Sequence, residues 1–335
     1  MGGMETYSMR LSEELAKLAP VEVVALPGRP DGQPPRATAL LGFPFTVLRR
    51  IIARREPVNV LHIADMAIWP LALLATLCRG SPRVVLSAHG TDVAYHRRGT
   101  VRGRLYGAYL RLGSRFLPRA KVIANSRATR DVVAETGWRK GAVVPLATDI
   151  VVPAPDGSND GTILFAGRLV ERKGCGWFIR EVLPLLPDGI RLKVAGTVWH
   201  ETERAALGHP CVDFIGNLDG DDLVQAYRRA LCVIVPNIEL ANGEYEGFGL
   251  VAVEAAAAGG LVIAADCGGL RDAVVDEVTG FLVPAGDAQE WANRIDAVRQ
   301  WTNGERARFL GKTSLEVERR FNWQRVAKET LALYA

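Results

Sequence analysis

The chain has 335 residues, of which 48% are hydrophobic and 23% charged, a balance that excludes a disordered chain and supplies apolar side chains for two hydrophobic cores. The longest apolar runs, such as Pro70–Cys78, are too short to span a bilayer, and no apolar leader follows Met1. The five cysteines are widely spaced and form no CxxC pair, which argues against a zinc site or a disulfide framework and predicts a cytoplasmic location.

The net charge of +4 hides an asymmetry between the two halves of the chain. Residues 1–130 hold 20 Lys and Arg against 8 Asp and Glu, which leaves 21 basic and 29 acidic residues in the remainder. A basic half joined to an acidic half predicts that the first half meets an anionic partner. An arginine-rich solvated surface explains the same charges.

In the first half, short apolar runs alternate with helical patterns. Such alternation predicts a parallel sheet covered by helices on both faces. The predicted strands are Val21–Leu26, Val58–Ile63, Arg83–Ala88, Lys121–Asn125 and Ala142–Leu146. The predicted helices lie near 4–18, 38–55, 67–78, 101–116 and 127–136.

The chain opens on Met1-Gly-Gly-Met-Glu5, a glycine turn that leads directly into a helix. A turn of this kind normally follows the first, central strand of a doubly wound sheet. We therefore expect the first domain to lack its first strand, either because the start codon is misplaced or because this domain is compromised.

A segment rich in Pro, Gly and polar residues at 151–160 predicts a linker, after which the alternation resumes. We expect an N-terminal Rossmann-like domain over 1–150, a second over 161–321, and a terminal helix over 322–335 that packs back on the first. The predicted strands of the second domain are Thr162–Ala166, Arg191–Ala195, Val212–Ile215, Cys232–Val235, Leu261–Ala264 and Gly280–Val283. Its predicted helices lie near 174–186, 221–230, 248–258, 287–302 and 304–320.

Glu246 and Glu254 bracket a Gly-x-Gly turn at the start of an apolar helix. The first amides of a helix lack partners within the helix and favour an anion, so a phosphate can bind there. The two carboxylates, about two helical turns apart, suit two hydroxylated groups. A helix start with an acidic pair by chance gives the same spacing.

Two other strand ends carry candidate residues. Arg168 and Lys173 follow the strand Thr162–Ala166, where the ligand crevice of a doubly wound sheet lies, and both cations can bind phosphate oxygens. Two solvated loop cations would look the same. His89 ends the strand Arg83–Ala88 and precedes a glycine that exposes the backbone, although a lone histidine is more often structural.

Together these segments resemble retaining glycosyltransferase family 4, whose members have the GT-B fold. The resemblance covers nearly the whole chain apart from the first strand. It rests on six motifs in the family's order: Gly2-Gly3-Met-Glu5, His89-Gly-Thr-Asp92, Gly167-Arg168 with Lys173-Gly174, Glu246 with Glu254, Gly268-Gly269, and Thr279-Gly-Phe-Leu-Val-Pro284.

The resemblance implies an α/β protein of the GT-B type, with two doubly wound parallel-sheet Rossmann-like domains facing across a cleft. It implies a hexosyltransferase that moves a sugar with retention from a UDP- or GDP-sugar to a glycan or lipid-linked acceptor, in polysaccharide, lipopolysaccharide or glycolipid biosynthesis. The alternatives are a nucleotide-sugar-binding protein without transferase activity and a GT-B epimerase or phosphorylase.

The implied roles divide between two groups of residues. In the catalytic group, Arg168 and Lys173 hold the diphosphate while His89 and Glu246 contact the transferred sugar. Glu254 binds the ribose, and backbone groups around Gly216-Asn217-Leu218 recognise the base. The remaining residues expected at the donor are Gly3, Gly247, Phe248, Gly249 and Leu250.

No cofactor or metal ion is expected. Asp219-Gly-Asp221-Asp222 looks like a DxD metal site, but it immediately precedes a helical run, where Asp caps the helix. Arg168, Lys173 and the helix dipole are expected to neutralise the diphosphate without a cation.

The acceptor side is expected in the first domain. Residues 97–121 hold eight basic residues and no acidic one, and Arg97, Arg98, Arg102 and Arg104 begin this run. Beside Leu41-Gly-Phe-Pro-Phe45 they predict peripheral attachment to an anionic inner membrane face. A solvated arginine surface with Phe43 and Phe45 in the core is the alternative. Nucleic acid is not expected, because the basic residues lack interleaved aromatic ones.

Overall fold

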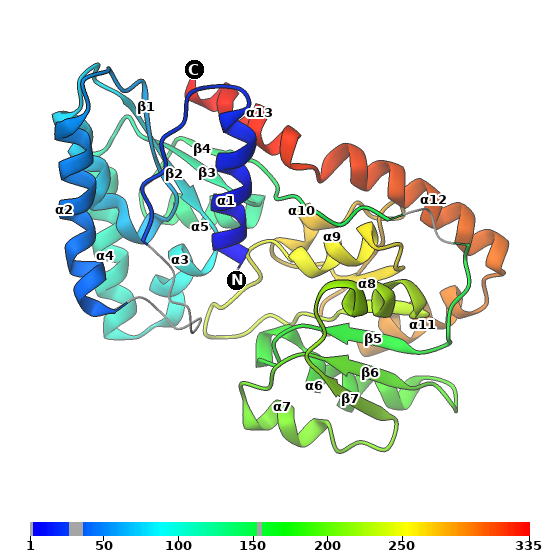
Figure 1. Ribbon diagram of the computed structural model, residues 1–335. Helices are drawn as coiled ribbons and strands as arrows, with labels where there is room; N and C mark the ends of the chain where they lie inside the picture. The colour runs from blue at the N-terminus through cyan, green and yellow to red at the C-terminus, as the bar shows by residue number, and fades with distance from the viewer. Residues whose placement is uncertain (1–2, 27–35, 153–155) are drawn as a thin grey trace. The chain divides into compact units, whose positions relative to one another are not determined.

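The computed structural model describes residues 3–26, 36–152 and 156–335, which form two compact units (Figure 1). The first unit comprises Met1–Val144 with Trp323–Ala335, and the second comprises Pro145–Asn322. The first unit thus ends earlier than the residue 150 expected from the sequence, and the terminal helix belongs to it. Residues 153–155 of the expected linker lie outside the described part.

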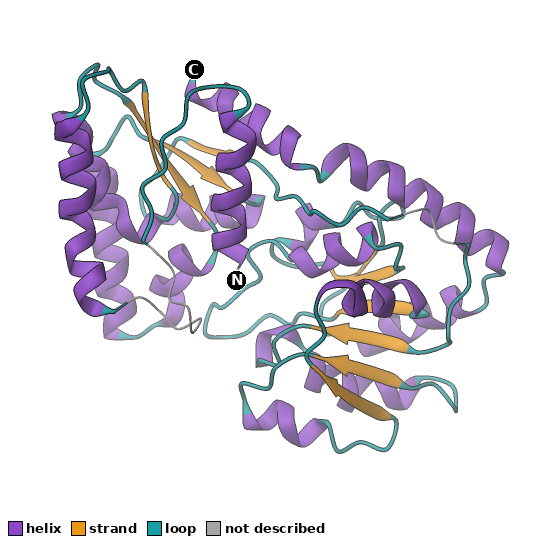
Figure 2. Cartoon of the chain, in the orientation of Figure 1, coloured by secondary structure: helices purple, strands orange, loops and turns teal. Residues whose placement is uncertain are grey.

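The first unit is built on a four-stranded parallel sheet (Figure 2). Its order is β1-β2-β3-β4, with β1 at Val60–Ile63, β2 at Arg83–Ala88, β3 at Lys121–Ala124 and β4 at Gly141–Val143. The helical elements of this unit are α1 (Gly3–Ala16), α2 (Ala37–Ala53), η1 (Met66–Leu77), α3 (Thr91–Ala94), η2 (Tyr95–Arg98), α4 (Val101–Phe116), α5 (Arg127–Glu135) and α13 (Trp323–Tyr334).

The strand predicted at Val21–Leu26 is wrong. The segment runs outside the described sheet, and Val21 and Val23 are 42% and 62% exposed. Its β-branched composition satisfies the local preference for a strand, but a strand also needs a neighbour for its backbone hydrogen bonds. None of the described strands pairs with it.

The core of the first unit forms between the sheet and its helices. Val85 and Leu86 of β2 are fully buried, and α13 buries Val326. The α13 helix packs against α1 and is also bound to the sheet by hydrogen bonds, because Arg83 donates to the carbonyl of Tyr334 at 2.7 Å. The terminal helix is therefore an integral layer of this unit.

The second unit is built on a six-stranded parallel sheet with the order β10-β9-β8-β5-β6-β7 (Figure 2). The strands are β5 (Ile163–Ala166), β6 (Leu192–Ala195), β7 (Val212–Gly216), β8 (Cys232–Val235), β9 (Val262–Ala265) and β10 (Phe281–Val283). The helices are α6 (Cys175–Trp177), α7 (Glu201–Ala206), α8 (Gly220–Arg229), α9 (Leu250–Ala257), α10 (Leu270–Ala273), α11 (Ala288–Arg299) and α12 (Asn303–Arg320).

Every residue of β5, β8 and β9 is buried, as expected for parallel strands covered on both faces. The chain moves outward from β5 through β6 to β7 and then returns to place β8 on the other side of β5. The order therefore reverses between β5 and β8. In open α/β sheets ligands bind at such a reversal, outside the carboxyl ends of the strands.

Two predicted helices of the second unit differ from the structure. The helix expected near 174–186 is α6 followed by a π-helical turn, η4 (Phe178–Val182), and a short 3₁₀ helix, η5 (Leu183–Leu185). Pro184 within this stretch has no amide hydrogen for a regular helix. Helix α9 begins at Leu250 rather than near 248, because Gly249 adopts a left-handed conformation with φ of 96°.

Candidate functional site

The loop after β5 lies close to the backbone at the ends of the two neighbouring strands. A Cβ atom at Gly174 would come within 1.9 Å of the carbonyl oxygen of Pro236, and one at Gly196 within 1.8 Å of that of Gly167. Only glycine permits these approaches, and both residues have positive φ. The glycines therefore bring the ends of β5, β6 and β8 together at the reversal of strand order.

Glu246 lies at the centre of a compact charged cluster at this edge. It accepts hydrogen bonds from Lys173 at 2.5 Å, Arg172 at 2.7 Å and Asn237 at 3.0 Å. Arg172 and Lys173 follow β5, and Asn237 follows β8, so the cluster spans the reversal. The side chains of Glu246, Arg172 and Lys173 are 13%, 10% and 11% exposed.

The charge state of Glu246 follows from this environment. Burial opposes ionisation, but the charges of Lys173 and Arg172 and the hydrogen bonds from Lys173 and Asn237 outweigh it and lower the pKa of Glu246 to about 2. The carboxylate is therefore ionised at neutral pH. The three charged side chains together carry a net charge of +1, which favours an anion at this edge.

Glu246 leads into the turn that starts α9. Gly269 donates to the carbonyl of Glu246 at 2.8 Å, and a Cβ atom at Gly269 would lie 2.2 Å from the carbonyl oxygen of Gly247. The Gly268-Gly269 pair therefore packs directly under the turn. Phe248 is buried against Phe321, with ring centroids 6.3 Å apart. Its side chain therefore packs in the core next to the turn and is not available to a ligand.

Glu254 lies on α9, one position beyond its buried residue Val253. Burial raises the pKa of Glu254, and the charge of Lys173 partly opposes that shift. Lys173 thus interacts with both carboxylates of the pair, directly with Glu246 and through its field with Glu254. The structure brings Lys173, Glu246 and Glu254 of the predicted set together.

Arg168 lies just beyond β5, at the strand end expected from the sequence. Its guanidinium lies over the indole ring of Trp199, 5.5 Å from the ring centroid, and the residue is exposed. Arg172 occupies the place beside Glu246 instead. Arg172 was not predicted as a site residue. The only signal was its place in the charged triplet Glu171-Arg172-Lys173.

In the first unit, His89 is held from both ends. Its backbone amide and that of Gly90 donate to one carboxylate oxygen of Asp92, at 2.9 and 2.8 Å. Its Nε2 lies 2.8 Å from the carbonyl oxygen of Ala64, and only a protonated Nε2 can donate there. In the neutral imidazole Nδ1 is then an acceptor. The ring of Tyr7 packs edge-on against the imidazole, with the ring centroids 4.8 Å apart.

The remaining predicted residues of the first unit differ in their surroundings. Gly3 begins α1, and Gly2 lies outside the described residues. Arg97 pairs with Glu135 of α5, so the basic run has a counter-charge that its own sequence does not contain. Arg98 lies over the ring of Tyr95 at 4.8 Å, whereas Arg102 and Arg104 are exposed on α4.

The aspartates that resemble a DxD site lie at the start of α8. Asp219 occupies the N-cap position, but its side chain makes no capping hydrogen bond. Among the described residues no group of three or more His, Cys, Asp or Glu is placed to hold a metal ion. None of the described helices is long and apolar enough to cross a membrane.

Two family models together match most of the chain. Residues 1–151 match the model described as Glycosyltransferase Family 4, and residues 160–300 match the one described as Glycosyl transferases group 1. The chain belongs to glycosyltransferase family 4. Membership in this family confirms the resemblance inferred from the motifs.

Curated relatives named as glycosyltransferases support the same family. The chain is 40% identical over 214 residues to a D-inositol 3-phosphate glycosyltransferase of Saccharomonospora viridis, covering 59% of this chain and 47% of that protein. It is 33% identical over 180 residues to an uncharacterised glycosyltransferase of Methanocaldococcus jannaschii, and this match covers 51% of this chain and 44% of that protein. The chain spans about half the length of the curated relatives it matches.

Solved structures show the fold. HepE of Anabaena in complex with UDP superposes with a TM-score of 0.73 at 19% identity, covering 99% of this chain and 96% of that one. Sucrose-phosphate synthase of Thermosynechococcus elongatus superposes with a TM-score of 0.73 at 23% identity, covering 99% of this chain and 93% of that one. The family 4 chain therefore has two parallel-sheet α/β domains of the GT-B type, as predicted.

Proposed function

We propose that the chain is a retaining hexosyltransferase whose second unit binds a nucleoside diphosphate sugar. The observation that carries the proposal is the cluster of Lys173, Glu246 and Glu254 at the reversal of strand order, beside the start of α9. This cluster combines a cation for phosphate with two carboxylates for hydroxyl groups. The UDP found in the HepE structure makes a UDP-sugar the first donor to test.

In the proposed complex the diphosphate binds Lys173 and the first amides of α9, and Glu254 accepts hydrogen bonds from the ribose. Glu246 is ionised and so can accept hydrogen bonds from sugar hydroxyl groups. Arg172 and Asn237 hold its carboxylate in place. Arg168 is exposed at the same edge, where its guanidinium can turn from Trp199 to a phosphate.

In the proposed reaction an acceptor oxygen forms the new bond to the anomeric carbon as the bond from that carbon to the diphosphate breaks. The acceptor's proton passes to the departing phosphate on the same face, so the reaction needs no side-chain nucleophile. Lys173, Arg172 and the α9 amides offset the charge that develops on the leaving group, which is worth several kcal/mol in comparable sites. No metal ion or other cofactor is required.

His89 is the first unit's candidate for a contact with the transferred sugar. Its Nε2 donates to the carbonyl oxygen of Ala64, which leaves Nδ1 able to accept a hydrogen bond. Asp92 fixes the backbone at this point from a buried position, with one carboxylate oxygen bound by two amides.

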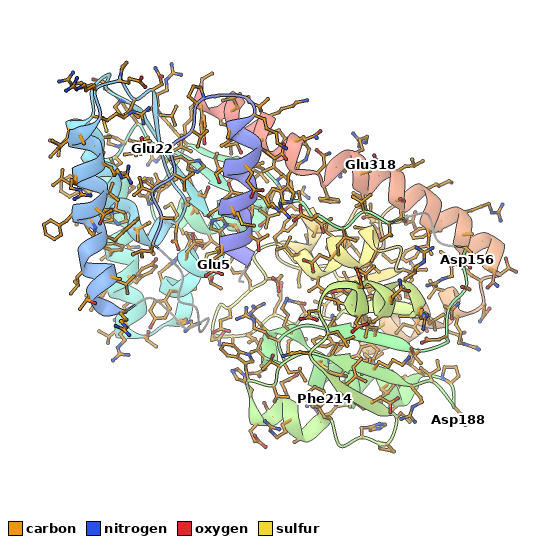
Figure 3. All side chains as sticks on the ribbon, in the orientation of Figure 1. Glu5, Glu22, Asp156, Asp188, Phe214 and Glu318 are labelled. Carbon is orange, nitrogen blue, oxygen red and sulfur yellow. The ribbon has the colours of Figure 1, made fainter. Side chains whose placement is uncertain are left out.

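Calorimetric titration with UDP, GDP and UDP-glucose tests the donor. We expect one nucleotide to bind, and Glu254→Gln to weaken it about tenfold or more, because a hydrogen bond to a charged group contributes about 1.5–3 kcal/mol. The matched control is Glu318→Gln, which replaces an exposed carboxylate on α12 (Figure 3). Failure of all three ligands to bind, or equal binding by the Glu254 variant, contradicts the proposal.

For the acceptor we propose a glycan or lipid-linked molecule reached at a membrane surface on the cytoplasmic side. The outer face of α4 supports this. Val101, Leu105, Leu112 and Phe116 are 66%, 66%, 47% and 59% exposed, and their spacing places them in one row along the helix. The arginines that flank the row are Arg102, Arg104, Arg111 and Arg115.

The opposite face of α4 explains why the apolar row points outward. This face carries Gly103, Gly107 and Gly113, and a Cβ atom at Gly113 would lie within 2.9 Å of the Trp69 and Trp138 rings. The helix packs through these glycines and the fully buried Leu110, and leaves the side chains of the apolar row in solvent. On α2, Phe45 is 73% exposed, so the alternative that placed it in the core is wrong.

Sedimentation with vesicles tests the membrane proposal. We expect binding to phosphatidylglycerol vesicles and not to phosphatidylcholine vesicles, weakened by the pair Leu105→Ser and Phe116→Ser. Leu315→Ser, a 70% exposed leucine on α12, controls for the loss of an exposed apolar side chain. Failure to bind phosphatidylglycerol vesicles removes the membrane from the proposal, and equal binding to both vesicle types removes the preference for an anionic surface. The names of the relatives make D-inositol 3-phosphate the soluble acceptor to test beside it.

A further inference from the structure

Trp199 is an exposed aromatic side chain at the ligand-binding edge of the second unit. It lies just beyond β6 and is 62% exposed, whereas the other six tryptophans of the chain are buried or half-buried. Apolar side chains of this size are normally covered, and an uncovered indole at a ligand crevice is a candidate contact for a flat ligand.

The position of Trp199 is fixed by backbone pairing that continues past the ends of the strands. Leu169 donates to the carbonyl of Thr197 at 2.9 Å, and Trp199 donates to the carbonyl of Leu169 at 3.1 Å. The loop after β5 and the loop after β6 are therefore joined as a short extension of the sheet. The indole is presented from a rigid base rather than from a free loop.

One neighbour of Trp199 belongs to the proposed phosphate site. Arg168 lies in the same loop as Lys173 and places its guanidinium over the Trp199 ring at 5.5 Å. Adjacent strands are about 4.8 Å apart, so this ring lies one strand away from the phosphate-binding loop. A nucleotide separates its base from its phosphates by a ribose, which matches this arrangement.

The other neighbour of Trp199 is the segment Gly216-Asn217-Leu218 at the end of β7. Gly196 donates to the carbonyl of Gly216 at 2.8 Å, and the hydroxyl of Thr197 donates to the side-chain oxygen of Asn217 at 2.9 Å. The Gly216-Asn217-Leu218 segment thus adjoins the strand end that bears Trp199. Backbone groups on one side and an aromatic face on the other provide hydrogen bonds and stacking for a planar heterocycle.

We propose that Trp199 is the stacking platform for the base of the donor nucleotide. The proposal rests on the proposed function, since it assigns a residue to the base of that donor. Stacking of a base on an aromatic side chain, measured by alanine substitution, changes affinity by about 5- to 150-fold. Arg168 then has two partners, the indole in the free protein and a phosphate in the complex.

The test compares a nucleotide with a ligand that lacks the base. Calorimetry with UDP, GDP and pyrophosphate is carried out on the wild type, Trp199→Leu, Trp199→Phe and Phe214→Leu. Phe214 is a 46% exposed aromatic residue on the outer strand β7 of the same sheet, labelled in Figure 3, and serves as the matched control. Tryptophan fluorescence during the nucleotide titration gives a second readout from the exposed indole.

We expect Trp199→Leu to weaken nucleotide binding about tenfold and to leave pyrophosphate binding unchanged, with phenylalanine restoring most of the affinity. Nucleotide should quench wild-type fluorescence, and this quenching should disappear in the leucine variant. Equal loss of nucleotide and pyrophosphate affinity would mean that Trp199 acts only on Arg168, which overturns the stacking role. Unchanged nucleotide affinity overturns it as well but leaves the donor proposal intact. Absence of any nucleotide binding by the wild type overturns the proposed function itself.

Discussion

Replacing Glu246 by glutamine keeps the shape of the side chain and removes the negative charge that faces Lys173 and Arg172. The folded protein then holds two largely buried cations without their carboxylate. The magnitude follows from the pKa of Glu246, which the fold lowers from 4.5 to about 2. Lowering the pKa by this amount corresponds to about 3 kcal/mol of stability at neutral pH. Breaking a buried ion pair by removing one partner costs a similar amount, about 3–5 kcal/mol.

The pH dependence has a definite sign. Because the pKa of Glu246 is lowered in the folded state, the unfolded chain binds the proton more readily, and stability falls as the pH falls. The contribution is complete above the unfolded pKa of 4.5, decreases as the pH falls below that value, and is nearly gone at pH 2. The stability gap between the wild type and Glu246→Gln should therefore close over this range.

Hydrogen–deuterium exchange of the β8 amides measures this gap within the second unit. The buried strand Cys232–Val235 reports the free energy of opening separately from the first unit. Glu318→Gln, which removes an exposed carboxylate of the same unit, should leave the exchange unchanged. A gap between wild type and the Glu246 variant that is below about 1 kcal/mol at pH 7, or that does not narrow below pH 4.5, would refute the reasoning.

Three further predictions address other parts of the chain. Lys173→Met should lower the rate of donor turnover by about 10²–10³ at saturating donor, measured by release of nucleoside diphosphate, and an unchanged rate would remove Lys173 from leaving-group stabilisation. Gly269→Ala should lower the melting temperature, because its Cβ would lie 2.2 Å from the carbonyl oxygen of Gly247. In Gly311→Ala on α12 the new Cβ meets nothing within 4 Å, so this variant should be more stable than the wild type by about 1 kcal/mol. Melting curves that rank the two variants the other way contradict this prediction. Burial and repulsion from His89 lower the pKa of His62 to about 4, so the first unit should lose about 3 kcal/mol between pH 6.5 and pH 4 as the unfolded chain takes up the proton. Hydrogen–deuterium exchange of the β2 amides should show this loss of stability, and the His62→Gln variant should depend less on pH over the same range.

The fold could largely be predicted from the sequence because local patterns carry most of its information. Each of the ten described strands overlaps one of the apolar runs predicted as strands, and α4 was predicted with its observed bounds, Val101–Phe116. Val21–Leu26 shows the limit of this reasoning. Its residues favour a strand, but strand formation is decided by a neighbour elsewhere in the chain.

The candidate site was only partly predictable. Lys173, Glu246 and Glu254 were recognised because glycines and helix starts mark their positions in the sequence. Arg172 and Asn237 carry no such mark, and they became site residues only through their hydrogen bonds to Glu246. The contact between Arg97 and Glu135 shows the same effect, since the counter-charge comes from 38 residues further along the chain.

The sequence by itself determined the two α/β domains, the family, and the strand ends at which ligand-binding residues occur, because apolar periodicity and glycine positions are local properties. The tertiary structure alone decided which charges meet. The crossing from β7 to β8 brings Asn237 and Glu246 beside the loop after β5, and the pairing of β5 with β6 places Arg168 on Trp199. These contacts depend on strand order, which sets the distance between residues that are far apart in the chain.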